Sequence, residues 1–250
     1  MSNDRDLTGS GHEPQTDSPF REPVRHREPV FNLPPVIIAL IALCAGIHVV
    51  RMWLLSPQQD LGVILRFAFF PVRYSGVYAL DVYAFLAPVT YSLLHGGVAH
   101  LAINMIWLAA FGSPLANRIG TLRFLLFWIL TSLAAAGLHY LLYRHSVVPL
   151  IGASGAISGM MGAAARFGFH IDRSGGRAAF GGPILSIPAV FTSRMAVTFL
   201  AVWFAVNLVM GLGFGTSEDG SSIAWEAHIG GFLAGFLLIR AFDPHPRARP

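Results

Sequence analysis

Ser154 is the residue of this sequence best placed to act as a nucleophile. It lies in the run Gly152-Ala153-Ser154-Gly155, where a loop meets an apolar segment rich in small residues. A serine at a helix N-terminus has its own N–H among the unpaired backbone donors there, and small neighbours let a substrate backbone approach. That combination suits a nucleophile beside an oxyanion site. Taken alone, such a run more often marks a serine that only caps a helix.

His228 is the candidate base for this serine. It lies in the run Ala227-His228-Ile229-Gly230-Gly231, with Gly235 four residues further on. Gly231 and Gly235 form a Gly-x-x-x-Gly face through which another helix can approach closely. His228 precedes Gly231 by three residues, so it shares nearly the same helical face. The glycines therefore define where the imidazole lies.

The segment that begins at Ser154 carries a matching face of small residues. Gly155 and Gly159 are also four residues apart. If the two helices pack through these faces, the Ser154 hydroxyl comes within reach of the His228 imidazole. A lone histidine in a span is more often a packing residue, but this one is placed by its neighbours.

A third set of polar residues is His95, His100 and Asn104. His100 and Asn104 are four residues apart and therefore one turn apart on one helical face, with His95 near the entry to that helix. Polar groups inside a span are costly and ask for an explanation. Together with Ser154 and His228 they indicate a serine hydrolase built from three helices.

The elements that must position these residues are membrane spans. The 250 residues are 54% hydrophobic and only 12% charged, with a mean hydropathy of +0.58, which excludes disorder and most soluble folds. The fold class we expect is an all-α polytopic membrane protein with six transmembrane helices. The six apolar segments are Val36 to Leu55, Val98 to Leu115, Leu122 to Tyr143, Ser154 to Phe169, Met195 to Phe214 and Ala227 to Phe242. The fourth, short and rich in small residues, should be the central helix of the bundle.

The segments outside the spans differ in character. Residues 1–33 are predicted to be a disordered cytosolic tail, residues 34–243 a six-span domain, and residues 244–250 a short C-terminal tail. The long connection at 56–97 carries many aromatic residues, which favours an interfacial, half-submerged element over a solvent loop. Residues 168–193, rich in Gly and Arg, are predicted to be a plain connector.

The distribution of the basic residues indicates how the chain is oriented in the membrane. The sequence contains 17 arginines and no lysine. With both termini in the cytoplasm, only Arg51, Arg66, Arg73 and Arg144 lie on the external side, as the positive-inside rule favours. The aromatic residues lie in hydrophobic stretches and not along a basic stripe, so we expect no nucleic-acid partner. Cys44 is the only cysteine and the remaining histidines lack partners at metal-ligand spacing, so we assign no metal and no cofactor.

These motifs, in their order and on their spans, resemble the rhomboid family of intramembrane serine proteases. The resemblance covers residues 34–243 and implies a six-span rhomboid-like bundle with a long interfacial first loop. It implies a Ser-His dyad without an acidic third member, in which Ser154 is the nucleophile and His228 is the general base and acid.

The resemblance also implies an oxyanion site. The His100 and Asn104 side chains would form it with the Ser154 N–H, and the Ala153 peptide is a further candidate. His95 would either keep the pocket polar and wet or hold the first loop by hydrogen bonds. The substrates would be membrane proteins whose transmembrane segment is weakened by Gly, Pro or polar residues, with a small residue before the cut. They would enter from the lipid bilayer past the span Met195 to Phe214, with Trp203 and Phe204 as candidate gate residues, although ordinary packing also explains this pair.

Three residues depart from the family pattern or stay open. Ser158 stands where many relatives carry an aromatic residue that packs on the histidine, so something else must orient His228. Glu226 is two residues from His228 and on another helical face, which favours a surface role at headgroup level. Asn207 would either form an interhelical hydrogen bond or line a cavity.

Two other function classes compete with the protease. One is a non-catalytic rhomboid-like protein that binds client transmembrane helices, and the retained serine and histidine argue against it. The other is a small transporter, which would need a polar pathway at mid-depth, whereas the polar residues here cluster near one face. The composition, with much Arg, Ala and Gly and no Lys, suggests a bacterial inner membrane.

Overall fold

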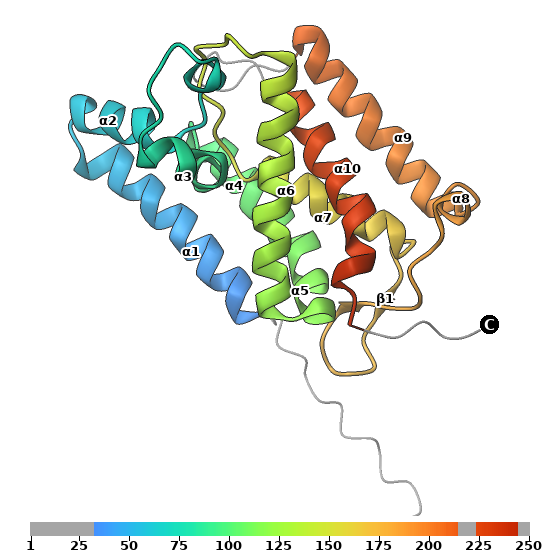
Figure 1. The fold of residues 1–250 in the computed structure, drawn as a ribbon. Helices are drawn as coiled ribbons and strands as arrows, with labels where there is room; N and C mark the ends of the chain where they lie inside the picture. The colour runs from blue at the N-terminus through green and yellow to red at the C-terminus, as the bar shows by residue number, and fades with distance from the viewer. Residues whose placement is uncertain (1–32, 215–223, 245–250) are drawn as a thin grey trace, which may run out of the picture. The chain divides into compact units, whose positions relative to one another are not determined.

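The computed structural model describes residues 33–214 and 224–244, and the chain is mainly helical there (Figure 1). The expected N-terminal tail lies outside the described residues apart from Leu33, and the expected C-terminal tail apart from Pro244. The helices and strands are α1 (Pro35–Val49), η1 (Val50–Leu54), α2 (Pro57–Phe67), η2 (Pro71–Tyr74), α3 (Val82–Thr90), η3 (Tyr91–Leu93), α4 (Val98–Trp107), η4 (Leu108–Gly112), α5 (Ser113–Ile119), α6 (Thr121–Leu142), α7 (Ser154–Arg166), β1 (Ile171–Asp172), β2 (Ala179–Phe180), α8 (Ile187–Val190), α9 (Arg194–Val209), η5 (Met210–Phe214) and α10 (Trp225–Phe242).

Four helical segments in the described residues are long and apolar enough to cross a membrane. They are Pro35–Leu54, Val98–Ile119, Thr121–Leu142 and Arg194–Leu212. This confirms the prediction of a helical multi-pass membrane protein. The two remaining expected spans are α7, with 13 residues, and α10, with 18 residues. The count of six spans therefore stays a prediction.

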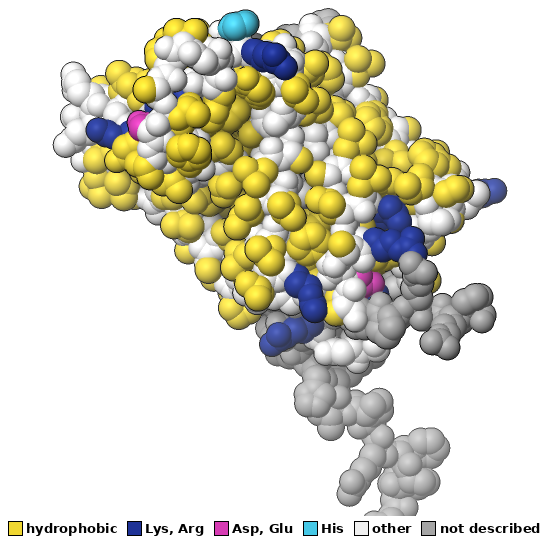
Figure 2. Space-filling model, in the orientation of Figure 1, with side chains coloured by type: hydrophobic (Ala, Val, Ile, Leu, Met, Phe, Trp, Pro, Cys, Tyr) yellow, Lys and Arg dark blue, Asp and Glu magenta, His cyan; other side chains and the backbone are white. Residues whose placement is uncertain are grey.

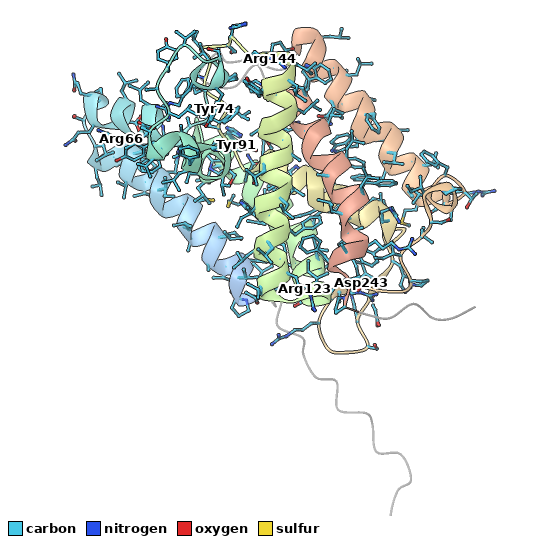
Figure 3. The ribbon with its side chains drawn as sticks, in the orientation of Figure 1. Arg66, Tyr74, Tyr91, Arg123, Arg144 and Asp243 are labelled. Atoms are coloured by element: carbon cyan, nitrogen blue, oxygen red, sulfur yellow. The ribbon has the colours of Figure 1, made fainter. Side chains whose placement is uncertain are left out.

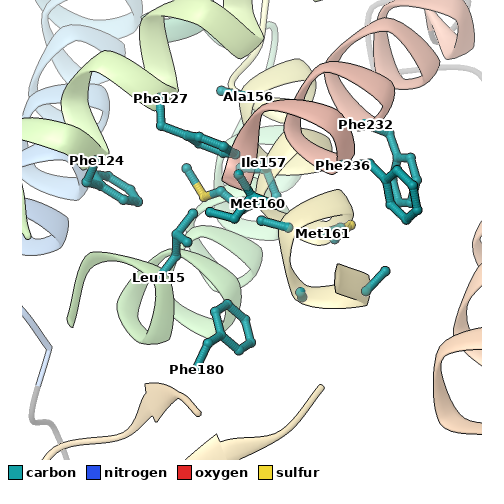
Figure 4. Packing of buried hydrophobic residues seen from close by; sticks show 14 of the residues in the cluster. Leu115, Phe124, Phe127, Ala156, Ile157, Met160, Met161, Phe180, Phe232 and Phe236 are labelled. Atoms are coloured by element: carbon teal, nitrogen blue, oxygen red, sulfur yellow. The ribbon is translucent and has the colours of Figure 1, made fainter. Parts of the chain in front are cut away.

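Helix α7 occupies the centre of the bundle, as its small residues predict. Every residue from Gly155 to Arg166 is buried, and α6 and α10 lie against the helix (Figure 1). The apolar core surrounds it, and Ile157, Met160 and Met161 belong to the same buried cluster as Phe127 of α6 and Phe232 of α10 (Figure 4). A helix of 13 residues can sit inside a bundle because the other helices, not lipid, surround its side chains.

The surface around this core is apolar. Leu126 and Leu133 of α6 and Leu208 of α9 are exposed, and Figure 2 shows hydrophobic side chains spread over the face that these helices form. Arg144 lies toward the end where α6 finishes, and Arg123 toward the end where it begins (Figure 3). An apolar band with charges at its two ends is the surface that a bilayer-spanning protein presents.

The first loop is a structured element and not an irregular connection. Ser56 caps α2 through a capping box with Gln59, and Asp81 caps α3 by accepting from the Ala84 N–H at 2.9 Å. Both helices expose apolar side chains, such as Leu61 on α2 and Phe85 on α3. The loop therefore has the short amphipathic helices that an interfacial element requires.

The prediction of a plain connector at residues 168–193 is wrong. This segment contains the antiparallel hairpin of β1 and β2 and the short helix α8. Phe180 of the hairpin stacks on Phe167 at a ring-centroid distance of 5.3 Å, and Arg118 donates to the Phe180 carbonyl. The Gly-rich composition concealed one buried aromatic residue, Phe180. Its packing on Phe167 holds the segment against the end of α7.

Candidate active site

Ser154 and His228 lie in direct contact although 74 residues separate them in the chain. Ser154 is the first residue of α7, and His228 lies near the start of α10. The His228 Nε2 atom is 2.9 Å from the Ser154 Oγ atom. Both side chains are partly accessible. A serine hydroxyl in hydrogen-bond contact with an imidazole is the arrangement that lets the imidazole remove the hydroxyl proton.

The glycines of α7 and α10 make this contact possible. A Cβ atom on Gly231 would overlap the Gly155 carbonyl, and a Cβ atom on Gly235 would overlap the Gly159 carbonyl. The backbones of the two helices therefore touch, with no side chain between them. This close crossing brings the first turn of α7 to the first turn of α10.

Helix α6 holds α7 from another side. A Cβ atom on Gly155 would lie 2.6 Å from the Ala135 Cβ and 3.1 Å from the Tyr91 hydroxyl. That hydroxyl donates to the Ser132 carbonyl of α6 at 2.9 Å. The start of α7 is thus enclosed by α6, α10 and the first loop.

Gly152 brings His100 to the site. It has a φ angle of +122°, a conformation that favours glycine, and its N–H donates to the Tyr91 carbonyl at 3.0 Å. A Cβ atom at this position would lie 2.8 Å from the His100 Nε2 and 3.7 Å from the Ser154 Oγ. The absence of a side chain here lets the His100 ring and the serine hydroxyl flank the same residue.

The first loop supports the strand-like segment that leads into Ser154. Phe69 and Leu150 form an isolated antiparallel bridge with backbone hydrogen bonds of 3.2 and 2.8 Å. The Val72 N–H also donates to the Ser146 carbonyl. These bonds fix the backbone just before Gly152, so the first loop helps to position Ser154.

His100 has a hydrogen-bond arrangement that favours a donor at Nε2. Its Nδ1 atom accepts a long hydrogen bond of 3.5 Å from the Gly96 N–H. A neutral imidazole that accepts at Nδ1 carries its proton on Nε2, the atom that faces Gly152. Asn104 donates through Nδ2 to the His100 carbonyl at 3.0 Å. This bond ties the amide to the turn that holds His100, whereas no hydrogen bond between Asn104 and Ser154 occurs among the described residues.

His95 lies behind His100 and is fully buried. Its ring meets the His100 ring edge-on, with centroids 5.2 Å apart. Burial lowers the pKa of the His95 imidazole to about 3, so the ring is neutral. Its carbonyl accepts from Arg51 at 2.9 Å, and Arg51 also pairs with Asp60 of the first loop. Neither ring nitrogen has a hydrogen-bond partner among the described residues, and the link to the first loop runs through the His95 backbone carbonyl. Ala153, the further oxyanion candidate, is buried at the N-cap position of α7.

The sequence interpretation did not identify the partners of two buried polar residues near this contact, Asn207 and Glu226. Asn207 of α9 contacts His228, with 2.9 Å between the Asn207 Oδ1 and the His228 Nδ1. Of the two roles left open for this residue, the structure shows the interhelical hydrogen bond. The prediction of a surface role for Glu226 is wrong, because its side chain is buried and pairs with His139 of α6. The partner of each residue is distant in sequence, and the only available signal was that an amide or a carboxylate in a span needs a partner.

Trp203 and Phe204 differ in their surroundings. Trp203 is buried and packs on Phe232 of α10, with ring centroids 4.4 Å apart. Phe204 is largely exposed and lies 5.9 Å from the same ring. Together they form an aromatic contact that packs α9 against α10.

In the described residues, no three His, Cys, Asp or Glu side chains gather as a metal site would require.

The sequence is similar to known proteins of one family. Residues 84–243 match the model of the rhomboid domain. The chain is 30% identical over 156 residues to RHOMBOID-like protein 4 of Arabidopsis thaliana, covering 61% of this chain and 33% of that protein. It is 29% identical over 149 residues to rhomboid protease GluP of Bacillus subtilis (strain 168), covering 60% of this chain and 24% of that protein.

A third relative matches over nearly the whole chain. The identity to rhomboid protease GlpG of Enterobacter sp. (strain 638) is 24% over 231 residues, covering 92% of this chain and 70% of that protein. The matched part spans only about a third of the Arabidopsis protein and about a quarter of GluP.

Proposed function

The chain belongs to the rhomboid family, and from this premise we propose that it is an intramembrane serine endopeptidase. Ser154 acts as the nucleophile, and His228 acts as general base and then general acid. The observation that carries the proposal is the 2.9 Å contact between the Ser154 Oγ and the His228 Nε2. Two of the relatives named above are called proteases.

The proposed reaction is acyl transfer in two halves. His228 Nε2 takes the Ser154 proton while Oγ attacks the carbonyl carbon of the scissile peptide bond. The tetrahedral intermediate collapses, His228 returns the proton to the leaving amine, and an ester to Ser154 remains. Water then attacks this ester with His228 as base, which releases the carboxylate product and restores the serine.

The oxyanion of the intermediate needs donors near Ser154. The Ser154 N–H belongs to the first turn of α7, whose amides have no partner within the helix. His100 Nε2 and the Ser154 Oγ both lie near Gly152, where an added Cβ atom would be 2.8 and 3.7 Å from them. Asn104 supports the site by fixing the turn of His100. Losing one such donor costs on the order of 100-fold in rate.

The substrates are membrane proteins that reach the site from the bilayer. Helix α9 is the least enclosed candidate span, with 17% of its most apolar stretch buried against 39% for α6. A substrate helix can therefore displace α9 more easily than α6. Its backbone must unwind before a carbonyl is exposed, so Gly, Pro or polar residues near the cut favour cleavage.

The topology proposed with this function has both termini in the cytoplasm, in a bacterial inner membrane. Residues 34–243 form the protease domain, and Ser154 opens to the external side. The arginine distribution supports this orientation.

The test uses the full chain in proteoliposomes with a model transmembrane substrate. Ser154→Ala and His228→Ala should each abolish cleavage, and Ser154→Ala should abolish labelling by a fluorophosphonate. Ser132→Ala is the matched control, because this buried serine of α6 lies outside the dyad, and it should retain both signals. Cleavage that persists in Ser154→Ala would disprove the proposal.

A folded wild-type protein that neither cleaves nor takes the label, but retains transmembrane helices in a pull-down, would favour the alternative function. That function is a non-catalytic protein that binds client helices.

A further inference from the structure

Asn207 is a buried amide of α9 that joins the serine and histidine in one chain of hydrogen bonds. The Asn207 Oδ1 is 2.9 Å from the His228 Nδ1, and the His228 Nε2 is 2.9 Å from the Ser154 Oγ. Only 5% of the Asn207 surface is exposed. The three side chains come from three different helices, α9, α10 and α7.

The orientation of the Asn207 amide follows from its second hydrogen bond. Its Nδ2 donates to the Trp203 carbonyl, one turn earlier in α9, at 2.8 Å. A carbonyl only accepts, so the nitrogen must face Trp203 and the oxygen must face His228. Since Oδ1 also only accepts, His228 carries its proton on Nδ1. The Nε2 lone pair then faces the hydroxyl that it must deprotonate.

No other described side chain takes this place. Ser158 offers no aromatic ring to pack on His228. Glu226, two residues away on α10, is engaged by His139. His100, on α4, and Ser154 are the other polar groups near the imidazole.

We infer that Asn207 is the positioning residue for His228, holding the imidazole in the tautomer and orientation in which Nε2 accepts the Ser154 proton. The inference rests on the proposed function for its catalytic consequence. The amide accepts from Nδ1–H whether His228 is neutral or protonated, so the ring keeps its orientation through both halves of the reaction. Because the amide is uncharged, it orients the ring without the stabilisation of the imidazolium that a carboxylate would add.

The kinetic test compares Asn207→Leu with Asn207→Asp in the full chain. Asn207→Leu removes the acceptor at similar volume and should lower kcat by about 100-fold with little change in KM, as expected when a reacting group is misplaced. Asn207→Asp keeps the acceptor and should retain most of kcat. Its added negative charge favours the imidazolium, so the acidic limb of the pH–rate profile should move to higher pH.

The control is Thr131→Val on α6. The Thr131 hydroxyl donates only to its own helix, at 2.7 Å to the Phe127 carbonyl, much as Asn207 does to Trp203. Thr131→Val should keep wild-type kcat and pH profile. Wild-type kcat in Asn207→Leu would overturn the inference, and so would equal losses in Asn207→Leu and Asn207→Asp with an unmoved acidic limb.

A spectroscopic test is independent of activity. Nitrogen-15 NMR of histidine-labelled protein, with the signal assigned by its loss in His228→Ala, should show the Nδ1–H tautomer in the wild type. An Nε2–H tautomer would overturn the inference even if Asn207→Leu does not fold. Failure of the proposed function is seen separately, as activity that does not depend on Ser154.

Discussion

His139 of α6 and Glu226 of α10 form a buried side-chain pair, with the imidazole Nδ1 bound to the carboxylate. Glu226 lies two residues before His228 in α10. Its pairing with His139 therefore connects the helix that carries His228 to α6. The His139 ring also contacts Phe69 and Tyr143, at 6.4 and 5.6 Å between ring centroids. This polar contact fixes the start of α10 against α6. It therefore also fixes the position of His228 beside Ser154.

Removing one partner of this pair should destabilise the protein. Glu226→Ala leaves the buried His139 imidazole without its acceptor. We expect the free energy of unfolding to fall by about 3 kcal/mol. Glu226→Gln keeps an acceptor and should lose less. The measurement is the thermal unfolding midpoint in detergent. The double variant His139→Leu with Glu226→Leu should be more stable than Glu226→Ala, because no unpaired polar group remains. Equal midpoints for Glu226→Ala and the wild type would contradict this role.

The sequence allowed the helices and their small-residue faces to be predicted, because apolar runs and four-residue glycine spacings are local patterns. It did not allow the partners of Glu226 and Asn207 to be identified. Each partner, His139 or His228, lies on another helix, and one sequence contains no sign of which polar residues meet. The same limit concealed the role of Phe180, whose ring stacks on Phe167 outside the hairpin.

The contact between α7 and α10 should not tolerate a methyl group at Gly231. Alanine there would overlap the Gly155 carbonyl, and overpacking of backbone against backbone should cost about 3 kcal/mol. We expect Gly231→Ala to lose cleavage and to unfold at lower temperature. Gly137→Ala on α6 is the control, since a Cβ atom at that position would have no neighbouring atom within 4 Å. Helix propensity should make that variant up to about 1 kcal/mol more stable. A fully active Gly231→Ala protein would show that the helices do not pack this closely.

Gly152 should matter for the reaction as well as for stability. Alanine at this position would place its Cβ 2.8 Å from the His100 Nε2 and push the ring away from the oxyanion. We expect Gly152→Ala to lower kcat by about 100-fold, the scale of a lost oxyanion donor.

The control for backbone strain is Gly120→Ala. Gly120 also has a positive φ angle, +80°, but a Cβ atom there would have no neighbouring atom within 4 Å. The variant should lose stability of about 1 to 3 kcal/mol and keep wild-type kcat at a temperature where it is folded. If both variants lose kcat alike, strain and not the contact with His100 explains the effect.

The aromatic contact between α9 and α10 should control the entry of large substrates. Trp203 and Phe232 hold the two helices together with ring centroids 4.4 Å apart, and α9 has few other buried residues. In a Cys44→Ser background, Trp203→Cys with Phe232→Cys can be joined by a short bismaleimide. We expect the joined protein to lose cleavage of the transmembrane substrate, because α9 can no longer move aside. Fluorophosphonate labelling of Ser154 should persist, because a small reagent needs no such movement and Asn207 stays beside His228.

The matched control joins α6 to α10 at the opposite end of the bundle. Phe127→Cys with Phe242→Cys replaces another aromatic pair, whose ring centroids are 5.4 Å apart. Joining these two positions should leave cleavage unchanged, because neither helix needs to move for a substrate to enter. Full cleavage by the protein joined at positions 203 and 232 would mean that substrates reach Ser154 without separating α9 from α10.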